Sequence, residues 1–233
     1  MRISIVLVLL AFFFIPKGSW AQGPDEDALG AWYMYFYSAQ LKDGPWGIQG
    51  DFQYRDWQGF GDREQLLLRS GLTYQPTDSR VLFTLGYGNV TTGVYGKESD
   101  QPSSESRIYQ EVLIKDRVLE RVHLTHRFRY EQRWVEEQDF RSRFRYNLFI
   151  NVPLNKKRLE KGALYIALYN ELFINGELDI GDDRQVQYFD RNRTYLGAGY
   201  ALGDDTRVQL GWMQQTTVAW QKAQLQFSLH QRF

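Results

Sequence analysis

The sequence lacks the features on which several common function classes depend. It has no cysteine, which excludes disulfide frameworks, thiolate metal sites and a thiol nucleophile. Basic and acidic residues number 28 each, so the zero net charge offers no basic excess for binding nucleic acid. After residue 21, no segment reaches the apolar length of about 20 residues that a membrane helix needs. What is present is enough material for one ordinary domain, rich in aromatic residues at 16%.

Histidine is scarce as well, and its positions do not indicate a metal site. His123, His126 and His230 show none of the paired spacing of a zinc site. Two glycine motifs, residues 86–88 and 197–199, lie inside extended segments with no helix after them, which argues against nucleotide binding. We interpret these glycines as positions that allow a sheet to curve, and we predict no metal and no cofactor.

The first residues, MRISIVLVLLAFFFIPKGSWAQ, match the pattern of a secretory signal peptide. A basic residue precedes an apolar run that is too short to span a bilayer. Ser19 and Ala21 then place small residues at the −3 and −1 positions of a cleavage site. We predict a signal peptide over residues 1–21 and a single domain over residues 22–233, the alternative being a membrane-anchoring helix.

The domain is built from segments with the period of a β-strand. In HRFRYEQRW, residues 126–134, three arginines and Glu131 share one face while aromatic side chains occupy the other. Segments of this kind follow one another between clusters of glycine, aspartate, asparagine, proline and serine. We predict strands near residues 29–39, 46–57, 63–75, 80–91, 105–116, 121–136, 139–152, 162–175, 186–202, 206–216 and 223–233.

The strand pattern favours an all-β fold, a transmembrane antiparallel up-and-down barrel. Along residues 163–175 and 140–151, one face is apolar and the other carries tyrosine, arginine and asparagine. Connections near 76–79, 116–120 and 203–205 are short, whereas 92–104 and 176–185 are long and polar, as on the two rims of such a barrel. A soluble sandwich is the alternative, but long strands and aromatic residues near strand ends favour the barrel.

The strand count conflicts with a rule for these barrels. Eleven segments are found, whereas single-chain bacterial barrels have an even number of strands. We therefore predict 10 or 12 strands and favour 12, with the first segment misread or a strand hidden beside residues 92–104.

The final segment, AQLQFSLHQRF, indicates how the chain reaches its membrane. Phe227, Leu229 and Phe233 share one face, and the chain ends on an aromatic residue. Bacterial outer-membrane barrels commonly end this way, and this resemblance implies the barrel assembly machinery as a partner. We predict an outer-membrane location in a Gram-negative bacterium, surrounded by outer-membrane lipid, with no nucleic-acid partner.

Several motifs in order resemble an uncharacterised family of bacterial outer-membrane barrels, the domain of unknown function 2490. They are RFRYEQR at 127–133, RFRY at 143–146 with Pro153, NELFIN at 170–175, NRTY at 192–195 and GAGY at 197–200. The resemblance covers nearly all of the domain and implies its fold and location. It implies no activity and no catalytic residues, because the family is defined without an activity.

The inward face is expected to carry a network of charges. If the hairpins turn near residues 137, 157 and 181, Arg143 lies opposite both Glu131 and Glu171, and Arg191 lies opposite Glu171. On the preceding hairpin, Glu111 would face Arg127. The predicted network comprises Glu111, Arg127, Arg129, Glu131, Arg133, Arg143, Arg145, Glu171, Arg191 and Arg193.

Three function classes remain open from the sequence. The first is a structural barrel or narrow small-solute passage, in which the interior either neutralises itself or leaves a positive path that favours anions. The second is a surface protein that binds through its long loops. The third is a lipid-modifying enzyme using His126, Ser142 and Asn170, but these would lie roughly 20 Å apart along the strands, so we predict no enzyme activity.

Overall fold

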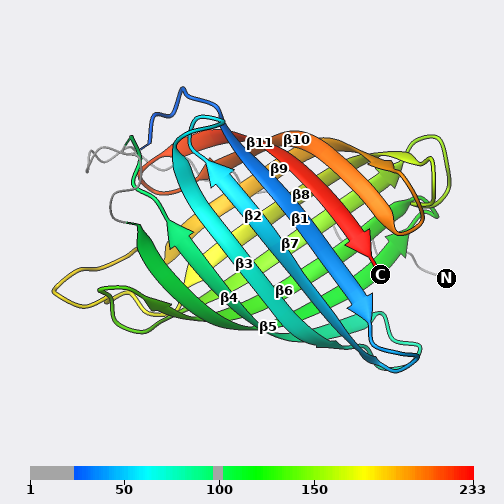
Figure 1. Cartoon of the computed structure of the whole chain (residues 1–233), viewed down its shortest axis with the longest axis horizontal. Helices are drawn as coiled ribbons and strands as arrows, with labels where there is room; N and C mark the ends of the chain where they lie inside the picture. The colour runs from blue at the N-terminus through cyan, green and yellow to red at the C-terminus, as the bar shows by residue number, and fades with distance from the viewer. Residues whose placement is uncertain (1–23, 97–101) are drawn as a thin grey trace, which may run out of the picture.

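The computed structural model describes residues 24–96 and 102–233, and these form a single closed β-barrel (Figure 1). The predicted signal peptide lies outside the described residues. Among the residues described, no helix is long and apolar enough to cross a membrane. The strands are β1 (Gly30–Gln40), β2 (Trp46–Asp56), β3 (Arg63–Tyr74), β4 (Val81–Thr92), β5 (Ser103–Val118), β6 (Val122–Val135), β7 (Arg141–Pro153), β8 (Leu164–Asn175), β9 (Phe189–Ala201), β10 (Thr206–Thr216) and β11 (Gln221–Arg232).

The described chain has eleven strands, so the preference for 12 was wrong. Each of the eleven segments that the sequence pattern predicted is a strand. Sequential neighbours pair antiparallel, but β1 and β11 close the barrel side by side in parallel, from Gly30 opposite Gln224 to Ser38 opposite Arg232. The predicted all-antiparallel barrel is therefore corrected at this one seam. The reason is geometric: in an up-and-down meander with an odd number of strands, the first and last strands run in the same direction. Odd-stranded membrane barrels are known.

Because the number of strands is odd, the first strand begins at one rim of the barrel and the last strand ends at the opposite rim. We call the rim where β1 begins rim A and the rim where β11 ends rim B; in Figure 1 these lie at the left and right. Rim A carries the connections 57–62, 93–102, 136–140, 176–188 and 217–220, and rim B carries 41–45, 75–80, 119–121, 154–163 and 202–205. Two of the longest connections thus lie on rim A, as predicted, but the 154–163 connection on rim B is also long.

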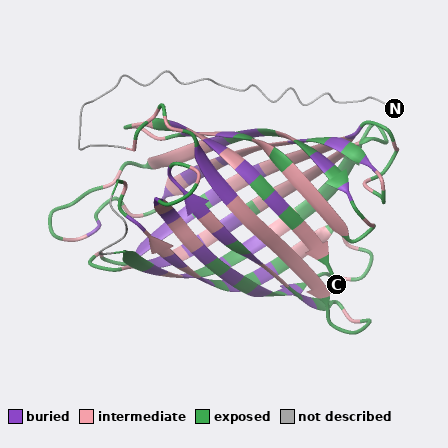
Figure 2. Ribbon diagram, turned by 45° about the horizontal axis from the view of Figure 1, so that its top comes forward, coloured by how far each residue is buried: buried purple, intermediate pink, exposed green. Residues whose placement is uncertain are grey.

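The alternation of side chains between the two faces is as the sequence predicted. In β7, Arg141, Arg143 and Arg145 are buried inside while Phe144 is exposed on the outer face. In β8 the odd residues from Tyr165 to Phe173 lie inside, and the even residues, which are apolar except for Asn170, lie outside. Figure 2 shows this as alternating buried and exposed bands along the strands. The barrel therefore has an apolar outer wall and a polar interior.

Tyrosine rings fill the interior where glycines of neighbouring strands make room for them. Tyr109 lies over Gly86, and Tyr165 lies over Gly199, which is directly opposite it in β9. Tyr165 is fully buried in a cluster with Trp32, Ala167, Tyr195 and Met213, against which Leu159 of the 154–163 connection packs. Two of the glycines predicted to allow curvature, Gly86 and Gly199, thus provide space for buried rings.

We expect Gly199→Val to lower the free energy of unfolding by about 1 to 3 kcal/mol through overpacking. A Cβ at this position would overlap the Tyr165 ring, which is held by a hydrogen bond of 3.1 Å from Gln209. Gly203→Val is the matched control, because a Cβ there meets nothing within 4 Å. Urea titration of both refolded variants measures the difference; equal stabilities would show that the ring has room to move.

Candidate functional site

The predicted charged residues do meet inside the barrel, but only part of the predicted pairing is correct. Glu131 lies opposite Arg143, as expected from a turn near residue 137. Glu171 lies opposite Asn147 and Arg193 instead of Arg143 and Arg191. Glu111 likewise faces Arg129 instead of Arg127. Each error is a shift by an even number of residues, which preserves the face and changes the partner.

Glu131 is the carboxylate at the centre of the network, and its side chain is completely buried. Its Oε2 accepts hydrogen bonds from Arg143 at 2.6 and 3.0 Å, and its Oε1 accepts one from Arg145 at 2.6 Å. The guanidinium nitrogens of Arg107 and Arg129 lie 3.9 and 3.8 Å away. One carboxylate therefore stabilises charges from three neighbouring strands.

Glu171 is a second shared carboxylate. Its Oε1 accepts hydrogen bonds from Arg127 at 2.7 Å and from Arg145 at 2.5 and 2.9 Å, while Arg193 approaches Oε2 only to 4.0 Å. Glu111 accepts a hydrogen bond of 2.6 Å from Arg129 Nε and forms an ion pair with its Nη2 at 2.5 Å. It also accepts a hydrogen bond from Gln49 of β2, which reaches across two strands. The predicted network is thus branched, with Arg145 as the bridge between Glu131 and Glu171.

Several members of the network were missed by the sequence reading. Glu105 pairs with Arg107 and Arg133, and Asp51 pairs with Arg69 at 2.9 Å. Asp190 accepts bonds from Arg143 at 2.8 Å and Arg191 at 3.1 Å. Asp51, Arg69 and Arg107 were detectable, because each lies on the inward parity of its strand. Asp190 was not, since it lies beside the irregularity in the β8–β9 register.

Two buried aromatic rings, those of Trp32 and Phe173, contact arginines of the interior. The guanidinium carbon of Arg55 lies 3.8 Å from the centre of the Trp32 ring, and that of Arg193 lies 4.7 Å from it. Arg193 also lies 4.7 Å from the Phe173 ring, which Arg145 contacts at 4.4 Å. Both rings are buried, where cation–π attraction is strongest. These stacks connect β2, β1, β9, β8 and β7 through the interior.

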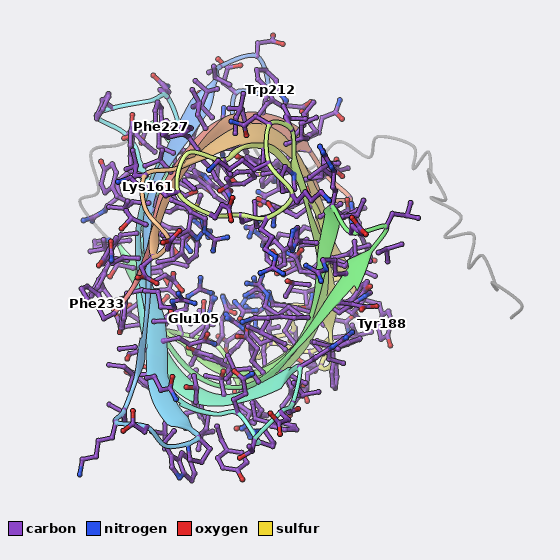
Figure 3. The ribbon with its side chains drawn as sticks, turned by 90° about the vertical axis from the view of Figure 1, so that its right-hand side faces the viewer. Glu105, Lys161, Tyr188, Trp212, Phe227 and Phe233 are labelled. Carbon is purple, nitrogen blue, oxygen red and sulfur yellow. The ribbon has the colours of Figure 1, made fainter. Side chains whose placement is uncertain are left out.

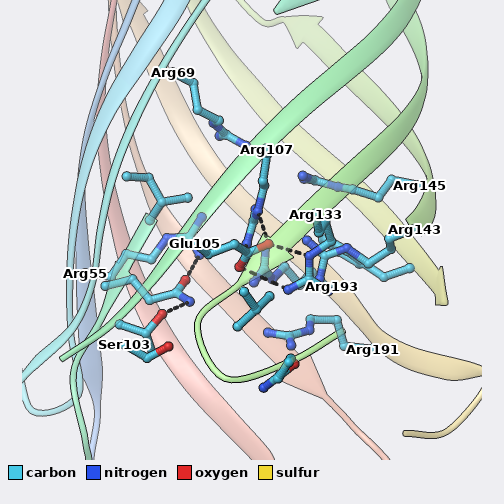
Figure 4. A pocket seen from close by; sticks show the side chains of 16 residues that line it. Arg55, Arg69, Ser103, Glu105, Arg107, Arg133, Arg143, Arg145, Arg191 and Arg193 are labelled. Atoms are coloured by element: carbon cyan, nitrogen blue, oxygen red, sulfur yellow. Dashed lines mark hydrogen bonds and ion pairs between the residues drawn. The ribbon is translucent and has the colours of Figure 1, made fainter. Parts of the chain in front are cut away.

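The network surrounds a cavity of about 210 Å³ near rim A. Figure 4 shows the guanidinium groups converging on it, and Figure 3, a view along the barrel, shows nitrogen-bearing side chains pointing into the interior. Glu105 is the one carboxylate that lines the cavity within the described part of the chain. The arginines that line it are Arg55, Arg69, Arg107, Arg133, Arg143, Arg145, Arg191 and Arg193.

The structure separates the three residues considered for lipid hydrolysis. Ser142 lies opposite Gln132, whereas His126 lies opposite Leu148, six positions further along β7 and so about 20 Å away. His126 instead contacts the Tyr146 hydroxyl at 2.9 Å, and Asn170 donates to Asn192 and Thr194. In the described residues no group of three or more histidine, aspartate or glutamate side chains is arranged to hold a metal ion.

The last strand carries the residues predicted to direct assembly. Phe227 and Leu229 are exposed on the outer wall, and Phe227 stacks on Tyr33 across the parallel seam with ring centres 6.0 Å apart. The Phe233 side chain is exposed at rim B, and its backbone N–H donates to Ser38 at 2.8 Å. The carboxyl terminus is thus bonded to the end of β1.

Fold and interior together define a closed β-barrel with an apolar outer wall and an arginine-rich core. The chain matches the model of a protein family of unknown function, DUF2490, over residues 29–226, and it belongs to that family. It is 30% identical over 177 residues to an uncharacterized protein of Methylorubrum extorquens, covering 73% of this chain and 74% of the relative. No solved structure matches the chain.

Proposed function

We propose that the protein is a transmembrane β-barrel of the bacterial outer membrane. Strands of 11 to 16 residues support this, because about 9 to 11 tilted residues span a bilayer. The outer wall also supports it: large apolar side chains such as Leu85, Leu196 and Phe144 are exposed there around the barrel. Outer-membrane lipid is then the natural contact of this wall, and the barrel assembly machinery is the expected partner in its insertion.

Within this barrel, the arginine-rich interior provides a narrow path that favours small anions. The observation that carries this proposal is the set of eight arginines around one cavity near rim A, against a single lining carboxylate among the residues that the structure describes. Rings of like charge select the opposite ion in pores. A barrel of this size, filled by long side chains, does not offer the wide aqueous channel of a 16-stranded porin. The role has no catalytic step.

Planar-bilayer conductance tests the anion path. We expect small, ohmic currents whose reversal potential in a potassium chloride gradient shifts toward that of chloride. Arg193→Gln should reduce this shift, while Arg80→Gln, which removes an exposed arginine at rim B, should leave it unchanged. A barrel that inserts but carries no current would make its role structural.

Leu168→Arg tests the membrane placement. Leu168 lies in the middle of β8 between Ile150 and Leu196, and arginine at the bilayer midplane costs about 2 to 4 kcal/mol. The control is Leu202→Arg in the 202–205 connection, where the cost is about 0 to 1 kcal/mol. Equilibrium folding into lipid vesicles measures both. If the two variants fold equally well, the outer wall at Leu168 does not face lipid.

A further inference from the structure

The arginines around the rim A cavity outnumber the carboxylates that can neutralise them. Eight arginines line it, and the carboxylates paired with these eight in the described residues number five: Asp51, Glu105, Glu131, Glu171 and Asp190. Three of these guanidinium groups therefore have no ion-paired carboxylate of their own among the described residues. Two of these five carboxylates are further shared, since Glu131 also lies near Arg129 and Glu171 also binds Arg127. Buried charge without a counter-charge is strongly unfavourable, so the cavity attracts an anion.

The unneutralised charge is concentrated on β2 and β9. Among the described residues Arg55 donates only to the side-chain oxygens of Gln53 and Gln65. The buried carboxylate of Glu64 acts on its charge from a distance but forms no ion pair with it within 4.0 Å. Arg193 donates to Gln215 at 2.6 Å and is 4.0 Å from Glu171. Both side chains are about 95% buried, and both stack on the same Trp32 ring. Arg191, beside them, has a buried Nε with no hydrogen-bond partner in the described structure.

Stacking fixes the positions of these groups without using up their hydrogen bonds. A ring face attracts the charge of a guanidinium but accepts none of its N–H bonds. Arginine presents its donors in a planar fork that matches two oxygens of a phosphate or carboxylate. Arginine forks from β2, β3, β5, β6, β7 and β9 meet around one small space, which suits an anion with oxygens in several directions.

We propose that this cavity is a binding site for a small multivalent oxyanion of the phosphate class. The volume of about 210 Å³ holds roughly seven waters at 30 Å³ each, which accommodates inorganic phosphate or pyrophosphate. It is below the roughly 300 to 1,000 Å³ of pockets for drug-sized ligands, so a small anion fits it better than a nucleotide does. The inference deepens the proposed anion path and rests on the same interior arginines, but it does not require that the path conducts.

The test is phosphate binding to the full mature chain refolded in detergent, measured by calorimetry with inorganic phosphate and pyrophosphate in chloride buffer. We expect saturable binding of one phosphate per chain. Arg55→Gln and Arg193→Gln should each weaken it at least about ten-fold, because each removes charge-assisted hydrogen bonds. Arg193→Lys, which retains the charge but loses the fork, should weaken it less and serves if Arg193→Gln does not fold. Arg80→Gln is the control, with affinity unchanged.

The outcomes separate this inference from the proposed function. If the barrel binds phosphate, loses this binding in Arg55→Gln and carries no current, the binding site is retained and the anion path is rejected. Anion-selective current without saturable phosphate binding would reject the site and retain the path. Binding that is equally strong in wild type, Arg55→Gln and Arg193→Lys would overturn the site, as would an affinity for acetate equal to that for phosphate.

Discussion

Replacing Glu131 by glutamine is expected to lower the free energy of unfolding by about 3 to 5 kcal/mol. The change keeps the shape of the side chain but removes the one charge that Arg143 and Arg145 share. Because Glu131 is completely buried, water does not replace the lost interaction. Urea titration of the refolded barrel, followed by tryptophan fluorescence, measures the difference.

The control for this prediction is Asp116→Asn. Asp116 pairs with Arg80 at 2.9 Å on the exposed rim B, where an ion pair contributes about 0 to 1 kcal/mol. The double variant Glu131→Gln with Arg143→Gln should recover part of the loss, since it also removes one of the charges left without a partner. A loss of less than about 1 kcal/mol for Glu131→Gln would show that water reaches the network and that the interior is open.

Trp32→Ala is expected to cost about 3 to 5 kcal/mol, which is typical of removing a large buried ring. Trp32 is 2% exposed and packs with Tyr165, Tyr195 and Met213, and its Nε1 donates to Glu64 at 2.8 Å. Its loss would also leave Arg55 and Arg193 without the ring on which both stack. Circular dichroism during urea titration measures the loss without relying on tryptophan fluorescence.

Trp212→Ala is the matched control, because it removes the same side chain from the outer wall, where Trp212 is 48% exposed. Its expected loss in detergent is well below that of Trp32→Ala. Trp32→Phe keeps a ring face and should retain part of the stability. If Trp32→Ala and Trp212→Ala lose equal stability, the buried Trp32 ring contributes no more to the free energy of unfolding than an exposed ring on the outer wall.

The sequence predicted the local features of the network better than its pairings. The inward face of Arg127, Arg129, Glu131 and Arg133 follows from period two alone, and the structure confirms it. The pairing of Glu131 with Arg143 was also correct, because the short 136–140 turn allows few registers. The partner of Glu171 was wrong on both sides, where the 154–163 and 176–188 connections are long.

By itself, the sequence determined that this protein is all-β, where its strands lie and which side chains face inward. These properties depend on neighbouring residues, since a strand turns successive side chains to opposite faces whatever it pairs with. Only the tertiary structure decided the parallel β1–β11 seam, the stacking of Arg55 and Arg193 on Trp32, and the cavity between them. A shift of two residues between strands leaves every side chain on its face but changes its partner, so pairing is settled only when the whole barrel closes.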